Sequence, residues 1–144
     1  MLFRSRYEIE KQLVNGNIAI GDLPEFWNSK MQEYLGVTPP NDTKGVLQDI
    51  HWSMGAIGYF PTYTLGNLYA AQLYAAALAD DPTITEKIAQ GQFAVLLDWM
   101  RSHIHIHGSK LLPADLMTQA TGKEPSSDAF IDYLQSKFTK IYGL

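Results

Sequence analysis

The sequence contains no cysteine, which excludes disulfide bonds and thiolate metal sites. It also has no excess of basic residues, because 11 Lys and Arg stand against 15 Asp and Glu for a net charge of −4 at pH 7. Nucleic-acid binding requires a basic surface, so we expect no nucleic-acid partner. A chain without cysteine is most at home in a reducing compartment, and we expect a cytoplasmic location.

Long hydrophobic runs are missing as well. The longest stretch without charge, residues 50–79, contains His, Gln, Asn, glycines and a proline, and we interpret it as a buried loop and helix. At the N-terminus, Arg4 and Arg6 follow Met1 without the apolar segment of a secretory signal. These features predict neither a membrane span nor a membrane partner.

Alternation with a period of two is absent except at His103–His107, whereas helical spacing and helix-end signals recur along the chain. We therefore predict an all-α fold with about six to seven helices in a single domain over residues 1–144. The expected helices or helical turns are 6–14, 23–35, 42–51, 65–79, a short one from 85, 92–107, 113–122 and 128–142.

Three of these helices carry predictions about burial. Helix 65–79 is apolar on nearly every side, which is typical of a central, buried helix. Helix 92–107 is expected to bury Phe93, Leu96, Leu97, Met100 and Ile104. The last helix is expected to turn inward Phe130, Ile131, Leu134, Phe138 and Ile141. Residues 53–63, rich in glycine and aromatic residues, are predicted to form a packed irregular loop that ends where Thr64 caps the next helix.

The densest group of side chains able to perform chemistry lies in residues 48–63. It consists of Gln48, Asp49, His51, Trp52, Tyr59 and Tyr63, on a loop rich in glycine. Such a loop can line a cleft with hydrogen-bond donors and stacking surfaces. The alternative, which composition alone favours, is a structural network that holds the entrance of the buried helix, because buried polar groups need partners.

His103, His105 and His107 form a second candidate cluster. On a helix His103 and His107 would share a face at a spacing that zinc can use. A gluzincin helix, however, needs Glu directly after its first His, and Ile104 stands there. We interpret these histidines as residues near a helix C-terminus, where their charge complements the helix dipole, and predict no metal site in this chain. A metal-binding protein that uses all three is the more distant alternative.

Residues 45–52, Gly-Val-Leu-Gln-Asp-Ile-His-Trp, match the Gly-x-x-Gln-Asp-x-His-Trp motif of the carboxypeptidase Taq family of metallocarboxypeptidases. Further segments resemble the same family, namely 6–11, 22–24, 58–66, 70–72, 104–108, 120–122, 133–134 and 142–144. The sequence thus resembles the C-terminal segment of such an enzyme over essentially its whole length.

The resemblance implies an all-helical, cleft-bearing gluzincin that removes single residues from peptide C-termini with the help of zinc or cobalt. The family's ligands, two His of a His-Glu-x-x-His helix and a later Glu, precede the matching region, so the resemblance implies no metal ligand and no peptidase activity in this chain alone. It also implies that Gln48, Asp49, His51 and Trp52 lie at the wall of the cleft. His51, Tyr59 and Tyr63 are suited to donate hydrogen bonds to a substrate, and Gln48 to orient it.

The resemblance fades at residues 1–5, which indicates a truncated gene product or a fragment expressed from an internal start. Apolar faces that a preceding part would cover are then exposed, and we expect self-association into a homo-oligomer, with the 6–14 helix or the 59–63 loop exchanged between chains. The alternative to a segment of an enzyme with a peptide substrate is a non-catalytic, self-associating remnant or interaction module.

Overall fold

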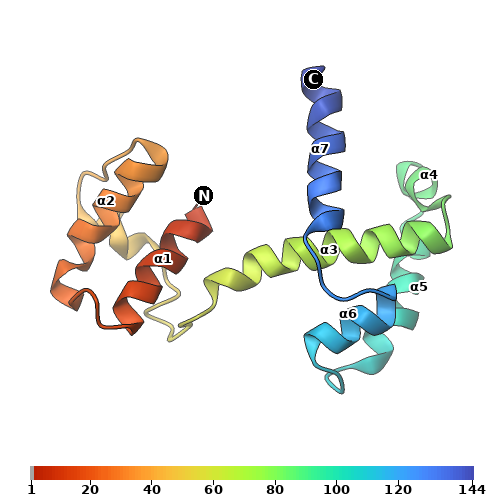
Figure 1. Cartoon of the computed structure of the whole chain (residues 1–144), viewed down its shortest axis with the longest axis horizontal. Coiled ribbons are helices and arrows are strands. Elements are labelled where there is room, and N and C mark those ends of the chain that lie inside the picture. Colours follow the sequence, from red (N-terminus) through yellow and green to blue (C-terminus); the bar gives the residue numbers. More distant parts are fainter. Residues whose placement is uncertain (1) are drawn as a thin grey trace. The chain divides into compact units, whose positions relative to one another are not determined.

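A computed structural model describes residues 2–144, apart from the side chain of Leu2. Over that range every regular element is helical, which confirms the predicted all-α class. The α-helices follow one another along the chain (Figure 1) as α1 Leu2–Val14, α2 Leu23–Leu35, α3 Phe60–Asp80, α4 Ile84–Ala89, α5 Ala94–His103, α6 Pro113–Thr121 and α7 Asp128–Tyr142. Short 3₁₀ turns stand at Ile20–Asp22, Asp42–Lys44, Val46–Gln48 and His105–His107.

The chain divides into two compact units, Met1–Leu65 and Gly66–Leu144, and α3 begins in the first and continues in the second. Each unit has a buried core of its own. The expected single domain over residues 1–144 stays a prediction beside this division.

The first unit is organised around α1 and α2, which lie side by side (Figure 1). Its core consists of Ile9, Trp27, Met31 and Val46, the last from the 3₁₀ turn after α2. Helix α2 has the predicted ends: Pro24 occupies the first turn, and Gly36 closes the helix in the left-handed conformation at φ 67°. Asp22 stands at the N-cap position, but its side chain makes no capping hydrogen bond.

The predicted loop 53–63 ends earlier than expected. Helix α3 starts at Phe60, so Thr64 is an interior helical residue and not a cap. Pro61 fits the first turn of a helix, where its missing N–H costs nothing, and Phe60 is only 1% exposed. Burial of Phe60 therefore fixes the start of the helix in the first unit.

The second unit has a small core of Ala77, Ile84 and Trp99, from α3, α4 and α5. The prediction that residues 65–79 form a central, buried helix is wrong, since only Gln72 and Ala77 are buried there. Two open apolar grooves run along α3. One, of about 580 Å³, lies between α3 and the start of α7, and the other, of about 540 Å³, between α3 and α5. The neighbouring helices of this unit therefore cover α3 only in part.

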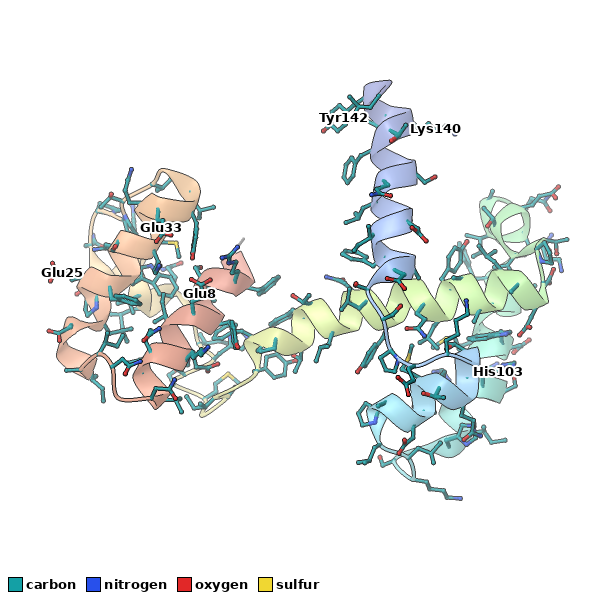
Figure 2. All side chains as sticks on the ribbon, viewed as in Figure 1. Glu8, Glu25, Glu33, His103, Lys140 and Tyr142 are labelled. Atoms are coloured by element: carbon teal, nitrogen blue, oxygen red, sulfur yellow. The ribbon has the colours of Figure 1, made fainter. Side chains whose placement is uncertain are left out.

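The predicted inward faces of α5 and α7 need correction. In α5, Trp99 is buried and donates its indole N–H to Asp80 Oδ2 at 2.7 Å, whereas Leu97 and Phe93, the residue before the helix, are exposed. Helix α5 ends at His103, four residues before the predicted end. In α7, Ile131, Phe138 and Ile141 are 45%, 40% and 59% exposed. Helix α7 projects away from α3 after its first turns, and Lys140 and Tyr142 lie at its far end (Figure 2).

The shorter helices agree better with the sequence. Helix α4 begins one residue before the predicted Thr85, and α6 runs from Pro113 to Thr121 with Gly122 left-handed behind it. The region predicted for residues 42–51 forms two 3₁₀ turns. Among the described residues, none of the helices combines the length and hydropathy needed to cross a bilayer.

Candidate functional site

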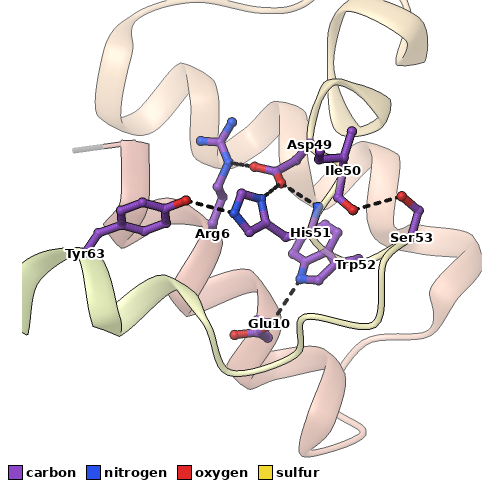
Figure 3. A network of polar contacts seen from close by, with 8 residues as sticks. All are labelled: Arg6, Glu10, Asp49, Ile50, His51, Trp52, Ser53 and Tyr63. Carbon is purple, nitrogen blue, oxygen red and sulfur yellow. Dashed lines mark hydrogen bonds and ion pairs between the residues drawn. The ribbon is translucent and has the colours of Figure 1, made fainter. Parts of the chain in front are cut away.

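Asp49 lies at the centre of a polar network in the first unit (Figure 3). Its Oδ2 accepts a hydrogen bond from Arg6 Nε of α1, and its Oδ1 contacts the ring Nδ1 of His51. The same Oδ1 also accepts the backbone N–H of His51 at 3.0 Å. The Asp49 side chain is only 7% exposed, so every one of these contacts is shielded from water.

The electrostatics of this network fix the state of Asp49. Burial of the Asp49 carboxyl acts to raise its pKa, but hydrogen bonds from the backbone and ring of His51 and from Arg6 outweigh burial, and the pKa is lowered. Asp49 is therefore a carboxylate at neutral pH. A carboxylate can only accept, so His51 Nδ1 carries a proton and donates it to Asp49.

The other ring nitrogen of His51 points to Tyr63. His51 Nε2 lies 2.9 Å from the Tyr63 hydroxyl, in the first turn of α3. With neutral His51 the phenol donates to Nε2, and with protonated His51 the direction reverses and the phenolic hydrogen is free to point elsewhere. Asp49, His51 and Tyr63 thus form a chain of hydrogen bonds that can pass a change in protonation to the phenol.

Aromatic rings enclose this chain. The Tyr59 ring stacks against His51 with centroids 5.5 Å apart, and the Phe60 ring lies 4.9 Å from it. On the other side, Phe3 of α1 stacks on Tyr63 at 4.2 Å. Between α1 and the start of α3 there is a groove of about 380 Å³, lined by Phe3, Arg4, Tyr7, Phe60, Pro61 and Leu65 among others. The polar chain therefore lies among apolar walls.

Two of the predicted site residues point elsewhere. Gln48 donates its side-chain N–H to the backbone oxygen of Thr43, within its own loop. Trp52 donates its indole N–H to Glu10 Oε1 of α1 at 3.1 Å, and its ring packs edge-on against Phe60 and Trp27. The structure thus brings Asp49, His51, Tyr59 and Tyr63 together, while Gln48 and Trp52 serve the loop and the core.

The residues that the sequence prediction missed lie on α1. Arg6 and Glu10, four residues apart, are the partners of Asp49 and Trp52 respectively. On a helix this spacing places both side chains on one face. The charged pair in a segment that already resembled the family, 6–11, was the signal that could have identified them.

The three C-terminal histidines do not share a helical face. His103 lies in the last turn of α5, donates Nδ1–H to the Trp99 carbonyl at 2.9 Å and stacks on the Trp99 ring. His105 and His107 follow in a 3₁₀ turn, and His107 Nε2 lies 3.4 Å from the Gln119 amide nitrogen. Residues 2–144, as described, contain no group of three or more His, Cys, Asp or Glu able to hold a metal ion.

The comparison with known families decides what the loop belongs to. A family model described as carboxypeptidase Taq (M32) metallopeptidase matches residues 4–138. This chain belongs to that family. The recognition of the family from residues 45–52 and the surrounding segments is therefore confirmed.

Individual relatives agree with this assignment. The chain is 44% identical to carboxypeptidase 1 of Bacillus subtilis and 45% identical to thermostable carboxypeptidase 1 of Thermus thermophilus, in each case over 96% of this chain. Among solved structures, the M32 carboxypeptidase of Deinococcus radiodurans superposes with a TM-score of 0.90 at 36% identity over 99% of this chain. The chain spans only 27% to 29% of the length of these relatives.

The family name also implies a metal ion in the full-length enzymes. The His and carboxylate residues of this chain do not fit such an ion. The Asp49 carboxylate is committed to Arg6 and His51. His103 donates Nδ1–H to a backbone carbonyl and keeps Nε2 as a ligand atom, but no set of three His, Cys, Asp or Glu gathers around it among the described residues.

Proposed function

We propose that this chain forms part of the substrate-cleft wall of a zinc- or cobalt-dependent carboxypeptidase that removes single residues from peptide C-termini. The observation that carries the proposal is the Asp49–His51–Tyr63 chain of hydrogen bonds within the family motif, held by Arg6. Membership of the carboxypeptidase Taq family supports it.

The proposed role of this part of the cleft wall is to donate hydrogen bonds to the substrate. Hydrolysis of a terminal peptide bond needs donors for the substrate carboxylate and for the oxyanion that develops at the scissile carbonyl. Tyr63 carries a phenol whose orientation depends on His51, and Tyr59 presents a half-exposed phenol beside the same imidazole. We assign the oxyanion contact to Tyr63 or His51, and contact with the peptide to Tyr59.

Gln48 and Trp52 receive different roles. Gln48 is the residue that we expected to orient substrate, and with one N–H bonded to the Thr43 carbonyl it can do so through its amide oxygen or its second N–H. Trp52 stabilises the loop through its hydrogen bond to Glu10 and its edge-on packing against Phe60. Asp49 acts through His51 and does not touch the peptide.

This chain alone is inactive as a peptidase under the proposal. A metallopeptidase metal activates water and polarises the carbonyl, and donors without it lower the barrier little. Purified chain, with zinc or cobalt added, is expected to release no amino acid from a peptide C-terminus. Metal-dependent release would overturn this part of the proposal and direct attention to His103, His105 and His107.

A chimera tests the contribution of the chain directly. The 139 matching residues of Bacillus subtilis carboxypeptidase 1 are replaced by this chain, and C-terminal amino acid release is measured. We expect an active chimera in which His51→Ala and Tyr63→Phe each lower kcat by about a hundredfold, as loss of one oxyanion donor does. His105→Ala and Tyr69→Phe serve as matched controls and leave kcat unchanged. A chimera whose kcat does not respond to His51→Ala excludes His51 from the site.

A second candidate function, self-association, rests on the exposed apolar side chains of α7. Ile131, Phe138, Ile141 and Tyr142 all lie open in the second unit, and α7 is one of the two helices that bound the larger groove. Such patches mark interaction sites. We propose a homo-oligomer through this helix in a cytoplasmic setting. Sedimentation of the purified chain tests it, and a monomer at all concentrations contradicts it.

A further inference from the structure

Arg6 is held more firmly than a surface arginine. It belongs to α1, 43 residues before Asp49 in the sequence, and its side chain is 15% exposed. Its guanidinium lies over the Trp27 ring, 4.9 Å from the centroid, while its Nε donates to Asp49 Oδ2. Stacking and an ion pair together fix the plane of the guanidinium, which a lysine amine could not reproduce.

The two carboxylate oxygens of Asp49 have different partners. Oδ2 is taken by Arg6, and Oδ1 is left for the backbone N–H and ring Nδ1 of His51. Rotation of the carboxylate would break both sets of contacts at once. The orientation of Asp49, and through it the choice of which His51 nitrogen carries the proton, thus depends on an α1 side chain outside the 45–52 motif.

We propose that Arg6 is a positioning residue: by anchoring the Asp49 carboxylate it holds His51 with Nδ1–H toward Asp49 and Nε2 toward the Tyr63 hydroxyl. The consequence for catalysis rests on the function proposed above. The positioning itself does not, because it is a property of the first unit of this chain and can be observed without turnover.

Nuclear magnetic resonance can read the position of the proton. Long-range ¹H–¹⁵N correlation of uniformly ¹⁵N-labelled chain distinguishes a protonated from an unprotonated ring nitrogen in each of the four histidines. For wild type, at a pH where the His51 ring is neutral, we expect His51 to show protonated Nδ1 and unprotonated Nε2. Exposed His105 provides the reference for an imidazole in water. Protonated Nε2 with unprotonated Nδ1 in wild-type His51 would overturn the inference at once.

Substitutions of Arg6 then test the cause. Arg6→Gln keeps a donor but loses the charge and the fork, and we expect the Nδ1–H signature of His51 to become a mixture of both forms. Arg6→Lys keeps the charge and is expected to lie between wild type and Arg6→Gln. The matched control is Arg4→Gln, on the same helix, where exposed Arg4 pairs with Glu8 and not with Asp49. It is expected to leave His51 unchanged.

Two outcomes contradict the proposal: an Arg6→Gln spectrum identical to wild type, or, should Arg6→Gln fail to fold, an Arg6→Lys spectrum identical to wild type. In the active chimera, Arg6→Gln is expected to lower kcat about tenfold or more with KM unchanged, since a misoriented oxyanion donor loses part of its effect. An inactive chimera with the expected His51 spectrum refutes the proposed function and leaves the positioning role intact. An active chimera together with an Arg6→Gln spectrum identical to wild type refutes the positioning role and leaves the proposed function intact.

Discussion

In the first unit, Met1–Leu65, the apolar core and the polar network meet at one loop, whereas the second unit, Gly66–Leu144, has a small core and broad apolar surfaces that remain open. Trp52 shows the first arrangement: its ring contacts core residues Trp27 and Phe60, and its N–H reaches Glu10. Ile141 shows the second, because it lies on the predicted inner face of α7 and is exposed.

The difference shows where each unit obtains its stability. In the first unit, buried charges such as Asp49 have specific partners, and their geometry depends on close packing around them. In the second unit, the apolar faces of α3 and α7 lack cover from the helices around them. Substitutions in the first unit should therefore disturb a precise arrangement, while many in the second should change only surface properties.

The largest effect is expected from Phe60→Ala in the first unit. Phe60 is 1% exposed and contacts the rings of His51 and Trp52. Removal of a buried phenylalanine ring typically costs about 3–5 kcal/mol through lost burial and the cavity left behind. Chemical denaturation of the two proteins measures the difference in free energy of unfolding.

The control for Phe60→Ala is Phe93→Ala in the second unit, where Phe93 is 66% exposed. A surface substitution of this kind changes stability by at most about 0.5 kcal/mol. Equal losses for the two variants would mean that the contrast in burial between the units is wrong.

The next largest effect is expected from Asp49→Asn. This change removes the negative charge and replaces one of the two acceptor oxygens used by Arg6 and His51 with an NH2 donor in a shielded place, and we expect a loss of about 2–3 kcal/mol, as for hydrogen bonds to charged groups. The pKa of Asp49 is lowered in the folded state, so its stabilising contribution is full above its ordinary pKa of about 4 and is lost as pH falls through the lower folded pKa.

The free energy of unfolding, measured as a function of pH on the whole chain, therefore distinguishes wild type from Asp49→Asn. Wild type should lose stability on acidification below about pH 4, and Asp49→Asn should lose less. Asp81→Asn is the comparison in the second unit. Hydrogen bonds from Thr83 and Lys87 lower the pKa of Asp81 to about 2, but this group is exposed and distant in sequence from the network. Its replacement should leave the His51 amide resonance unmoved, and a shift there would refute the local origin of the acid response.

Sequence patterns predicted these two regions unequally. Helix ends at Gly36, Gly122 and Gly143 were correct, because each needs a left-handed residue after the last turn and glycine provides it. The cluster Asp49, His51 and Tyr63 was found through a local motif. Its partner Arg6 was not, because the charged pair in segment 6–11 marks a helix face but does not show which residue, 43 positions away, that face contacts. The prediction of burial was wrong for α3 and α7. An apolar stripe shows that a helix face can pack against a neighbour, but it does not show that a neighbour covers that face.

A smaller effect is expected for Gln72→Leu, because Gln72 is a buried polar residue that anchors a loop of the second unit. Gln72 is 6% exposed, donates to the backbone oxygens of Lys123 and Glu124, and accepts the Ser126 N–H at 3.1 Å. Loss of these bonds leaves loop groups without partners and should cost about 1–3 kcal/mol. Thermal unfolding measures it, with faster hydrogen exchange of the Ser126 amide as the local signature.

The control for Gln72→Leu is Gln135→Leu, on the exposed side of α7. It should leave both the midpoint and the Ser126 exchange rate unchanged. Slower exchange at Ser126 in Gln72→Leu would mean that the loop is held by its apolar neighbours instead.

The smallest effect on stability, and the most informative for the second unit, is expected from Ile141→Ser in α7. Ile141 is 59% exposed, so replacement should change the free energy of unfolding of a single chain by at most about 0.5 kcal/mol. If two copies meet through this helix, the same change removes apolar area from the contact and weakens association in sedimentation. Glu25, on the surface of α2, provides the control, since Glu25→Ser alters the first unit without touching the apolar face. An Ile141→Ser variant that associates as strongly as wild type would show that α7 is not the contact between copies. The next partner to test for the exposed apolar face of α7 would then be the rest of a carboxypeptidase chain.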